Sequence, residues 1–355
     1  MVVAKGTING QPAVVIAIEG TFQGGSMGEV SGAKMAAALE LAAEDNRNGI
    51  PTQAVLCLET GGVRLQEANL GLAAIADIHA AIVDLRRYTP VVGIIAGTVG
   101  CFGGMSIAAA LCSYLIVTRE ARLGLNGPQV IEQEAGIEEY DSRNRPFIWS
   151  MTGGEIRAAS GLVDALVNDG VNAVKTAMNE AIAKGVPVQH RSDNYDDYLR
   201  RLSQFDTRQQ ADTAQIKQLL PGRINNESVP KPRRAVAEQT GARRAADERP
   251  VPFRPVADGQ INGENVRFIA VVPDANNHYP RAAGGEVGLL EGWTLAKVVN
   301  ETIAADADQP VKRPIVAVID VPSRPMAAAK KLSAFTVRWP GRLALMPKPV
   351  WPATR

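Results

Sequence analysis

The stretch that decides the fold is Val91-Val-Gly-Ile-Ile-Ala-Gly-Thr-Val-Gly-Cys-Phe-Gly-Gly-Met105. Its apolar first part, residues 91–96, is typical of a strand that is buried on both faces. Glycines follow at positions 97, 100, 103 and 104, and an alanine-rich helix is expected over residues 106–112. A glycine-rich turn between a strand and a helix lets the backbone approach a ligand and points free N–H groups at it. A tight turn that only packs the helix on the sheet would leave the same pattern.

A second turn of the same kind lies earlier in the chain. A short buried strand, residues 54–58, ends in Glu59-Thr-Gly-Gly-Val-Arg-Leu-Gln-Glu67. Two parallel strands that each feed a helix place their loops at the same edge of a sheet, so two sets of backbone N–H groups are expected there. Two converging donors are what an oxyanion needs. The pair of turns therefore indicates an anion-binding site made of backbone.

Three ordered segments resemble the signatures of carboxyltransferase subunits with the crotonase fold. They are Thr60-Gly-Gly-Val-Arg-Leu-Gln-Glu67, Gly100-Cys-Phe-Gly-Gly104 and Gly124-Leu-Asn-Gly-Pro-Gln-Val-Ile-Glu-Gln133. Within that group, the resemblance narrows to beta subunits of biotin-independent malonate decarboxylases and covers roughly residues 2–185. Repeated strand–helix units with short glycine turns already favour an α/β fold with parallel strands. The resemblance implies a crotonase (ClpP-like) ββα superhelix, as in the carboxyltransferase N-terminal-type domain.

The resemblance implies decarboxylation of a malonyl thioester, from malonyl to acetyl carrier protein plus CO2, through an enolate held by backbone donors. In the crotonase pattern one donor comes from the first loop, here Gly62 or Val63. The other comes from the start of the helix after the second loop, here Gly103 or Gly104. The candidate substrate-binding residues are Gly24, Gly25, Arg64, Gln66, Glu67, Gly100, Cys101, Phe102, Gly127 and Pro128.

Several of these side chains allow two interpretations. Arg64 could pair with a phosphate or with the substrate carboxylate, or it could brace its own loop through Glu67. Cys101 could be a nucleophile, but it has no nearby histidine in the sequence, and packing is the default for such a cysteine.

Two further groups of titratable side chains lie close to these segments. Glu132 and Glu134 could assist proton transfer or could belong to a solvated helix face. His79, inside the helix expected over residues 70–88, is expected on the helix surface or in the core rather than as a catalytic base.

Composition excludes several other classes of function. Lys and Arg number 38 against 37 Asp and Glu, so no overall charge favours nucleic acid or an anionic membrane. The three cysteines have no metal-ligand spacing and are expected as reduced thiols in a cytoplasmic protein. No apolar stretch approaches the ~20 residues of a membrane span. The phosphate-loop motif is absent from the sequence.

The implied chemistry requires neither a metal nor a cofactor bound by this chain. By resemblance, the malonyl group is carried on the phosphoribosyl-dephospho-CoA (CoA-like) arm of an acyl carrier protein. The partners would be that carrier, an alpha transferase subunit and a gamma subunit. Two alternatives stay open: a carboxyltransferase subunit of a biotin-dependent acyl-CoA carboxylase, and an inactive subunit that only docks partners.

The sequence divides into four parts. Residues 1–220 are expected to form the crotonase-fold domain, and residues 221–258, with six prolines and eight Arg or Lys, a linker. Residues 259–323, with expected buried strands at 266–272 and 314–320, resemble an incomplete start of a malonate decarboxylase gamma subunit. Residues 324–355 contain no Asp or Glu and are expected to be an unstructured tail, with a shifted or truncated reading frame as the suspected origin.

Overall fold

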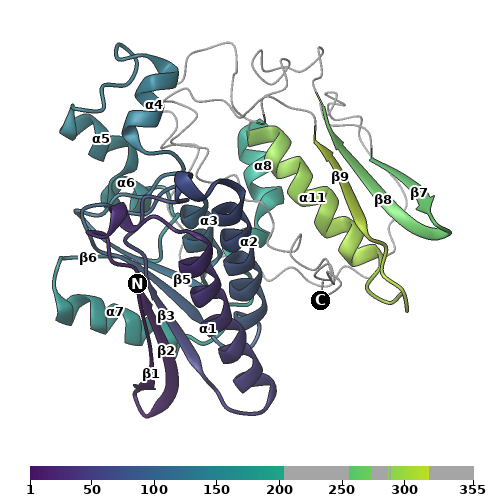
Figure 1. Cartoon of the computed structure of the whole chain (residues 1–355), viewed down its shortest axis with the longest axis horizontal. Helices are drawn as coiled ribbons and strands as arrows, with labels where there is room; N and C mark the ends of the chain where they lie inside the picture. Colours follow the sequence, from purple (N-terminus) through teal and green to yellow (C-terminus); the bar gives the residue numbers. More distant parts are fainter. Residues whose placement is uncertain (204–255, 273–286, 288, 320–355) are drawn as a thin grey trace, which may run out of the picture.

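The computed structural model describes residues 1–203, 256–272, 287 and 289–319 (Figure 1). Its larger sheet has six strands in the order β1-β2-β3-β4-β5-β6. Strands β1 (Val2–Ile8) and β2 (Gln11–Ala17) pair antiparallel. They are joined by Asn9 and Gly10, both with positive φ, as a tight Asn-Gly hairpin requires.

All other neighbours in this sheet pair in parallel. The strands are β3 (Gln53–Cys57), β4 (Val91–Ile95), β5 (Tyr114–Thr118) and β6 (Ala165–Val167). Every residue of β4 is buried, as expected for a central strand that is covered on both faces. The prediction of an α/β fold with parallel strands is confirmed.

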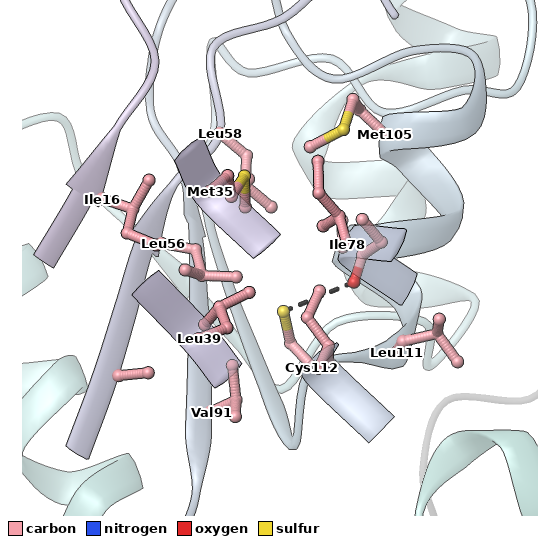
Figure 2. Close-up of a cluster of buried hydrophobic side chains, with 14 of the residues drawn as sticks. Ile16, Met35, Leu39, Leu56, Leu58, Ile78, Val91, Met105, Leu111 and Cys112 are labelled. Atoms are coloured by element: carbon pink, nitrogen blue, oxygen red, sulfur yellow. Dashed lines mark hydrogen bonds between the residues drawn. The ribbon is translucent and has the colours of Figure 1, made fainter. Parts of the chain in front are cut away.

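Helices cover both faces of the sheet (Figure 1). On one face lie α1 (Glu29–Arg47), α2 (Ala68–Leu85) and α3 (Gly104–Leu111), and on the other lies α7 (Val171–Ala183). Figure 2 shows the core between the sheet and the first three helices, where Leu56 and Leu58 of β3 meet Met35 and Leu39 of α1. Alternate strand residues, such as Val55 and Val92, pack against α7 instead.

The helix α2 is unusually apolar for its length. The segment Leu65–Leu85 is long and apolar enough to cross a membrane by length and composition alone, so the expectation that no stretch reaches that length is wrong. A core helix of a soluble protein meets the same criterion. In this fold α2 packs against α1 and α3 and buries residues such as Ile75, Ile78 and Ile82 in the core.

Three short helices form a satellite beside the edge of the sheet that carries the loops. They are α4 (Pro128–Ala135), α5 (Arg145–Thr152) and α6 (Gly154–Ala159), with a small apolar cluster around Tyr140. Before these helices, residues 122–125 form isolated bridges, from Arg122 to Gly153 and from Leu123 to Cys101.

The C-terminal end of α3 is held by two buried arginines. Arg86 donates to the carbonyl of Leu111 over 2.8 Å, and Arg191 donates to that of Cys112 over 2.9 Å. Arg191 lies in a short 3-10 helix, η3 (Arg191–Asp193), and also forms an ion pair with the buried Asp164. Cations at a helix C-terminus satisfy its free carbonyls and favour its dipole, so α3 is fixed at this end.

A smaller unit follows after the residues that are not described. It has the three-stranded sheet β7-β8-β9, formed by Val256–Ile261, Glu264–Val271 and Ile315–Ile319, and the helix α11 (Leu289–Ala305). This helix packs against α8 (Tyr195–Ser203), where Lys297 pairs with Asp196 at 3.2 Å.

Two predictions for this region were wrong. Strand β7 begins at residue 256, inside the stretch predicted as a linker up to 258. The strand predicted as buried over residues 314–320 is β9, an edge strand of the described sheet, in which Ala317 and Val318 are exposed. The remainder of the linker, most of the segment between β8 and α11, and the tail from residue 320 lie outside the described residues. The four-part division itself stays a prediction.

A pair of leucines on α1 tests the core. Leu39 is fully buried and Leu41 is 62% exposed. We expect Leu39→Ala to lower the free energy of unfolding by about 2–5 kcal/mol, because it leaves a cavity between α1 and β3. Leu41→Ala should change it by less than about 0.5 kcal/mol. Urea denaturation of both variants measures this, and equal losses would contradict the packing of α1.

Candidate active site

Two glycine-rich loops meet at the carboxyl ends of β3 and β4. The N–H of Thr60 donates to the carbonyl of Gly100 over 2.7 Å, and the N–H of Phe102 donates to that of Thr60 over 3.0 Å. This parallel bridge between Thr60 and Cys101 continues the ladder of β3 and β4 beyond the strands. The first donor loop, residues 60–64, and the second donor loop, residues 100–104, therefore lie side by side.

The two loops touch through a pair of glycines. A Cβ atom on Gly62 would lie 2.9 Å from the carbonyl oxygen of Phe102 and 3.1 Å from the Cα of Gly103. A Cβ atom on Gly103 would lie 3.1 Å from the Cα of Gly62 and 3.6 Å from the backbone nitrogen of Val63. Both glycines also have positive φ, 107° and 61°. Glycine is required at both positions by conformation and by space.

Hydrogen bonding separates the four candidate donors into two pairs. The N–H of Gly62 donates to Oγ1 of Thr60 over 3.1 Å, and the N–H of Gly103 donates to the carbonyl of Leu125 over 2.7 Å. Within the described part of the chain, the N–H groups of Val63 and Gly104 donate to no protein atom. Gly62 and Gly103 are therefore spacers whose N–H groups are occupied, and Val63 and Gly104 have the free donors.

The N-terminus of α3 strengthens the second donor. Gly104 is the first residue of α3, so its N–H is one of those that the helix itself leaves unsatisfied. The positive end of the helix dipole lies at the same place. His79 of α2 donates to the carbonyl of Gly104 over 2.8 Å, and burial lowers the pKa of this imidazole. His79 thus braces the first turn of α3, in agreement with its expected structural role.

A third loop runs along the first donor loop. It contains the short 3-10 helix η1 (Gln23–Gly25) and pairs in parallel with residues 61–64. The N–H of Gly61 donates to the carbonyl of Gly24, and the N–H of Met27 donates to that of Gly62, both over 2.8 Å. A Cβ on Gly25 would collide with the carbonyl of Glu59. Gly24 and Gly25 therefore border the first donor loop, and their contact with substrate stays a prediction.

Arg64 is a brace within this loop pair. It donates to the carbonyl of Ser26 over 2.9 Å and to Glu67 over 2.7 Å, and its guanidinium lies over the ring of Phe22. Glu67 in turn accepts the N–H of Glu29 at the start of α1 over 2.6 Å. The bracing interpretation of Arg64 and Glu67 is thus supported over the substrate-binding one. Gln66 is exposed beside them.

The third signature segment borders the second donor loop. Leu125 accepts the N–H of Gly103, and Gly124 packs against the ring of Phe102. Gly127 and Pro128 cap and begin α4 a few residues later, and their role toward substrate stays a prediction. Glu132 accepts the N–H of Ser142 over 2.7 Å, and Glu134 is exposed. Neither observation assigns these carboxylates to proton transfer.

Cys101 and Phe102 are core residues of the second donor loop. Cys101 is fully buried, and this burial raises the pKa of its thiol well above the ordinary 9.0. A thiol held in its neutral form is a poor nucleophile, which favours the packing role. Gly100 has a φ of 85° and lies against the carbonyl of Arg122.

Two charged residues that the sequence analysis did not single out lie against the donor loops. Glu59 precedes the first loop and accepts the N–H of Val99, while Arg122 donates to carbonyls just before the second loop. The sequence does not indicate the contact between Glu59 and Val99, because an acidic residue before a glycine turn has no characteristic partner. Among the described residues, no group of three or more His, Cys, Asp or Glu is placed to hold a metal ion.

Comparison with known proteins gives a consistent result. Residues 1–229 match the carboxyl transferase domain family. The malonyl-S-ACP:biotin-protein carboxyltransferase MADC of Malonomonas rubra is 38% identical over 194 residues, 52% of this chain and 61% of that protein. The chain therefore spans less than two thirds of this relative's length.

Two solved structures from Pseudomonas resemble this chain. One is a malonate decarboxylase hetero-tetramer in complex with malonate, 70% identical with a TM-score of 0.60, which covers 61% of this chain and 79% of the matched one. The other is the MdcD–MdcE hetero-dimer of malonate decarboxylase, 69% identical with a TM-score of 0.53. This match covers 57% of this chain and 84% of the matched one. The predicted carboxyltransferase fold and the resemblance to malonate decarboxylase subunits are confirmed, whereas the gamma-like origin of residues 259–323 stays a prediction.

The glycine contact between the loops can be tested by substitution. We expect Gly103→Ala to lower the free energy of unfolding by about 1–3 kcal/mol, because an alanine at this φ and ψ is strained. Gly170→Ala is the matched control, since its φ of 173° is extended and a Cβ there meets no atom within 4 Å. Chemical denaturation compares the two, and an unstrained Gly103→Ala would argue against the described loop geometry.

The burial of Cys101 predicts its chemical reactivity. In the folded protein near neutral pH, iodoacetamide should leave Cys101 unmodified, because the raised pKa keeps the thiol protonated and the side chain is inaccessible. After unfolding in urea the same cysteine should be alkylated readily. Peptide mass spectrometry measures the alkylation of Cys101 in both states. Rapid alkylation in the folded state would support the interpretation of Cys101 as a nucleophile.

Proposed function

We propose that this chain, which belongs to the carboxyl transferase domain family, is a malonate decarboxylase subunit that removes CO2 from a malonyl thioester. One observation carries the proposal: the free N–H groups of Val63 and Gly104 belong to two loops that touch at the glycine pair 62 and 103. The identity of 70% to a chain of the Pseudomonas malonate decarboxylase supports this choice within the family.

The chemistry of decarboxylation explains why two backbone donors suffice. Loss of CO2 from a malonyl thioester leaves the enolate of the acetyl thioester, with negative charge on the thioester oxygen. A preorganised donor aimed at such an oxygen contributes about 3 kcal/mol, or ~10²–10³ in rate. Because the charge grows during the reaction, these donors favour the transition state over the ground state.

The fold keeps both donors in place before substrate arrives. On the first loop, the N–H of Met27 bonds to Gly62 and the N–H of Arg64 bonds to Met27, so the peptide of Val63 is fixed on both sides. On the second loop, Gly104 begins α3, whose C-terminal end is anchored by Arg86 and Arg191. Fixed donors need no reorganisation as the enolate forms.

The substrate carboxylate has a different part in this scheme. Arg64 is occupied by Ser26 and Glu67, so holding the carboxylate is not its proposed role. An arginine bound to that carboxylate would also stabilise the ground state and oppose loss of CO2. Stabilisation of the enolate oxygen is therefore the proposed source of catalysis.

The remaining parts of the system are proposed by analogy with the relatives. The malonyl group would be carried by an acyl carrier protein on a CoA-like phosphoribosyl-dephospho-CoA arm, and the Malonomonas rubra relative is named for malonyl-S-ACP. An alpha transferase and a gamma subunit would complete a complex, as the hetero-dimeric and hetero-tetrameric relatives suggest. We place this complex in the cytoplasm.

A second candidate function is transfer of the carboxyl group to biotin. The relative from Malonomonas rubra is named as a malonyl-S-ACP:biotin-protein carboxyltransferase, which favours this reading. The same enolate would form at the same donors, and the difference lies in whether CO2 is released or captured by biotin.

One assay separates these functions. Release of CO2 from malonyl-CoA is measured with the full chain alone, with a full-length gamma subunit, and with free biotin added. Turnover independent of biotin supports the decarboxylase. Formation of carboxybiotin without release of CO2 supports the second candidate. Inactivity under every condition would overturn the proposal and favour an inactive subunit that only docks partners.

A proline at position 104 tests the second donor directly. Gly104→Pro removes one N–H at the first position of α3, where proline is tolerated. Gly104→Ala is the matched control, because it keeps the N–H and shares the contact of a Cβ with Ile75. We expect kcat for Gly104→Pro to be ~10²–10³ lower than for Gly104→Ala. Equal rates in the two variants would remove Gly104 from the proposed site.

A further inference from the structure

The segment Gly97–Gly100 links the end of β4 to the second donor loop, and two charged side chains hold it. Oε1 of Glu59 accepts the N–H of Val99 over 2.6 Å. From the other side, Nη2 of Arg122 donates to the carbonyls of Thr98 and Val99 over 2.8 and 3.2 Å. The peptide of Val99 is therefore held at both its N–H and its carbonyl.

Glycines make room for the carboxylate of Glu59. A Cβ on Gly97 would collide with this carboxylate, and a Cβ on Gly20 would lie 2.5 Å from its Cγ. These two glycines follow β4 and β2, and Glu59 itself follows β3, so the carboxylate lies among the ends of three neighbouring strands. Its second oxygen, Oε2, is buried, and among the described residues no group forms a hydrogen bond of good geometry with it.

The guanidinium of Arg122 is itself fixed by aromatic rings. It lies 5.6 Å from the centre of the Phe102 ring and 4.9 Å from that of the Trp149 ring. Phe102 belongs to the second donor loop and Trp149 to α5, so this contact joins the satellite helices to the loop. The arginine and the glutamate form the two sides of one clamp on residues 98 and 99.

We propose that Glu59 is a positioning residue, whose carboxylate holds the Gly97–Gly100 segment so that the N–H of Gly104 stays opposite the N–H of Val63. This inference rests on the proposed function for its catalytic consequence. Two donors must point at one oxygen, and a displacement of about 1 Å at such a site costs on the order of 10² in rate. Glu59 is joined by sequence to the first donor loop and by its hydrogen bond to Val99, which directly precedes the second.

The surroundings of Glu59 give the clamp a dependence on pH. Burial raises the pKa of this carboxyl above the ordinary 4.5, although the N–H groups of Val99, Gly100 and Gly97 and the charge of Arg122 lower it in part. Cys101 is a further titratable neighbour, and its raised pKa keeps the thiol neutral. Glu19, at the end of the neighbouring strand, is exposed and accepts a hydrogen bond from Thr21. A protonated carboxyl is a weaker acceptor than a carboxylate. Acidification should therefore loosen the segment at a midpoint above 4.5.

Three variants of the full chain test the proposal. Glu59→Ala removes the acceptor for Val99, Glu59→Gln keeps an acceptor oxygen without a titratable group, and Glu19→Ala is a control at the end of the neighbouring strand. Amide hydrogen exchange of peptides that cover residues 97–104 reports the segment without reference to activity. The kcat and KM for malonyl-CoA are measured across pH, with the gamma subunit if turnover requires it.

We expect faster amide exchange at Val99 in Glu59→Ala. Its kcat should be at least ~10-fold lower and its KM should change less than ~3-fold, because the variant misplaces the donors without weakening substrate binding. Glu59→Gln should recover most of kcat and lose the acidic limb of the pH profile. Glu19→Ala should match the parent chain in every measurement.

Two results would overturn the proposal: unchanged exchange at Val99 in Glu59→Ala, or a Glu59→Gln variant as inactive as Glu59→Ala, which would make Glu59 a proton donor instead. If the parent chain shows no turnover in any arm while exchange at Val99 rises in Glu59→Ala, the clamp is supported and the proposed decarboxylase function fails.

Discussion

The structure depends on a close contact between two loops that have no side chains at the point where they meet. Strands β3 and β4 are paired in parallel, and the pairing extends past their ends through Thr60 and Cys101. That extension brings Gly62 and Gly103 within van der Waals contact. The start of α3, the course of the first donor loop and the third loop beside it all follow from this contact. A Cβ atom on either glycine would push the two donors apart.

Much of this arrangement follows from sequence, because it rests on local signals. The buried run of β4, the Asn-Gly hairpin and the glycine turns depend on hydrophobic period and on φ, which single residues determine. The choice between Gly62 and Val63 does not, because it depends on where Oγ1 of Thr60 points. Likewise the choice between Gly103 and Gly104 depends on the carbonyl of Leu125, which a separate segment brings into place.

Side-chain roles were harder to predict for the same physical reason. Arg64 allowed two interpretations because Ser26, its deciding partner, lies far away in the sequence. The contacts of Glu59 could not be predicted from the sequence, because Gly20 and Gly97 make the space for its carboxylate and have no side chains that would indicate a contact. The exposure of β9 depends on what covers a sheet, and an apolar run alone carries no information about that cover. The local hydrophobic period thus predicts helices and strands, whereas the roles of single side chains depend on contacts with residues that are distant in the sequence.

The anchoring of α3 at its far end bears on how the chain can be divided. The resemblance seen in the sequence motifs covers roughly residues 2–185, although the family match extends to residue 229, and a version of the protein shortened to that resemblance would end near Gly185. Such a fragment would lose Arg191, and with it the donor to the carbonyl of Cys112 and the partner of Asp164. A buried carbonyl without a donor costs about 1–3 kcal/mol, and a buried carboxylate without its cation costs more. The smallest autonomous piece of this protein therefore extends past η3, beyond the last recognisable motif.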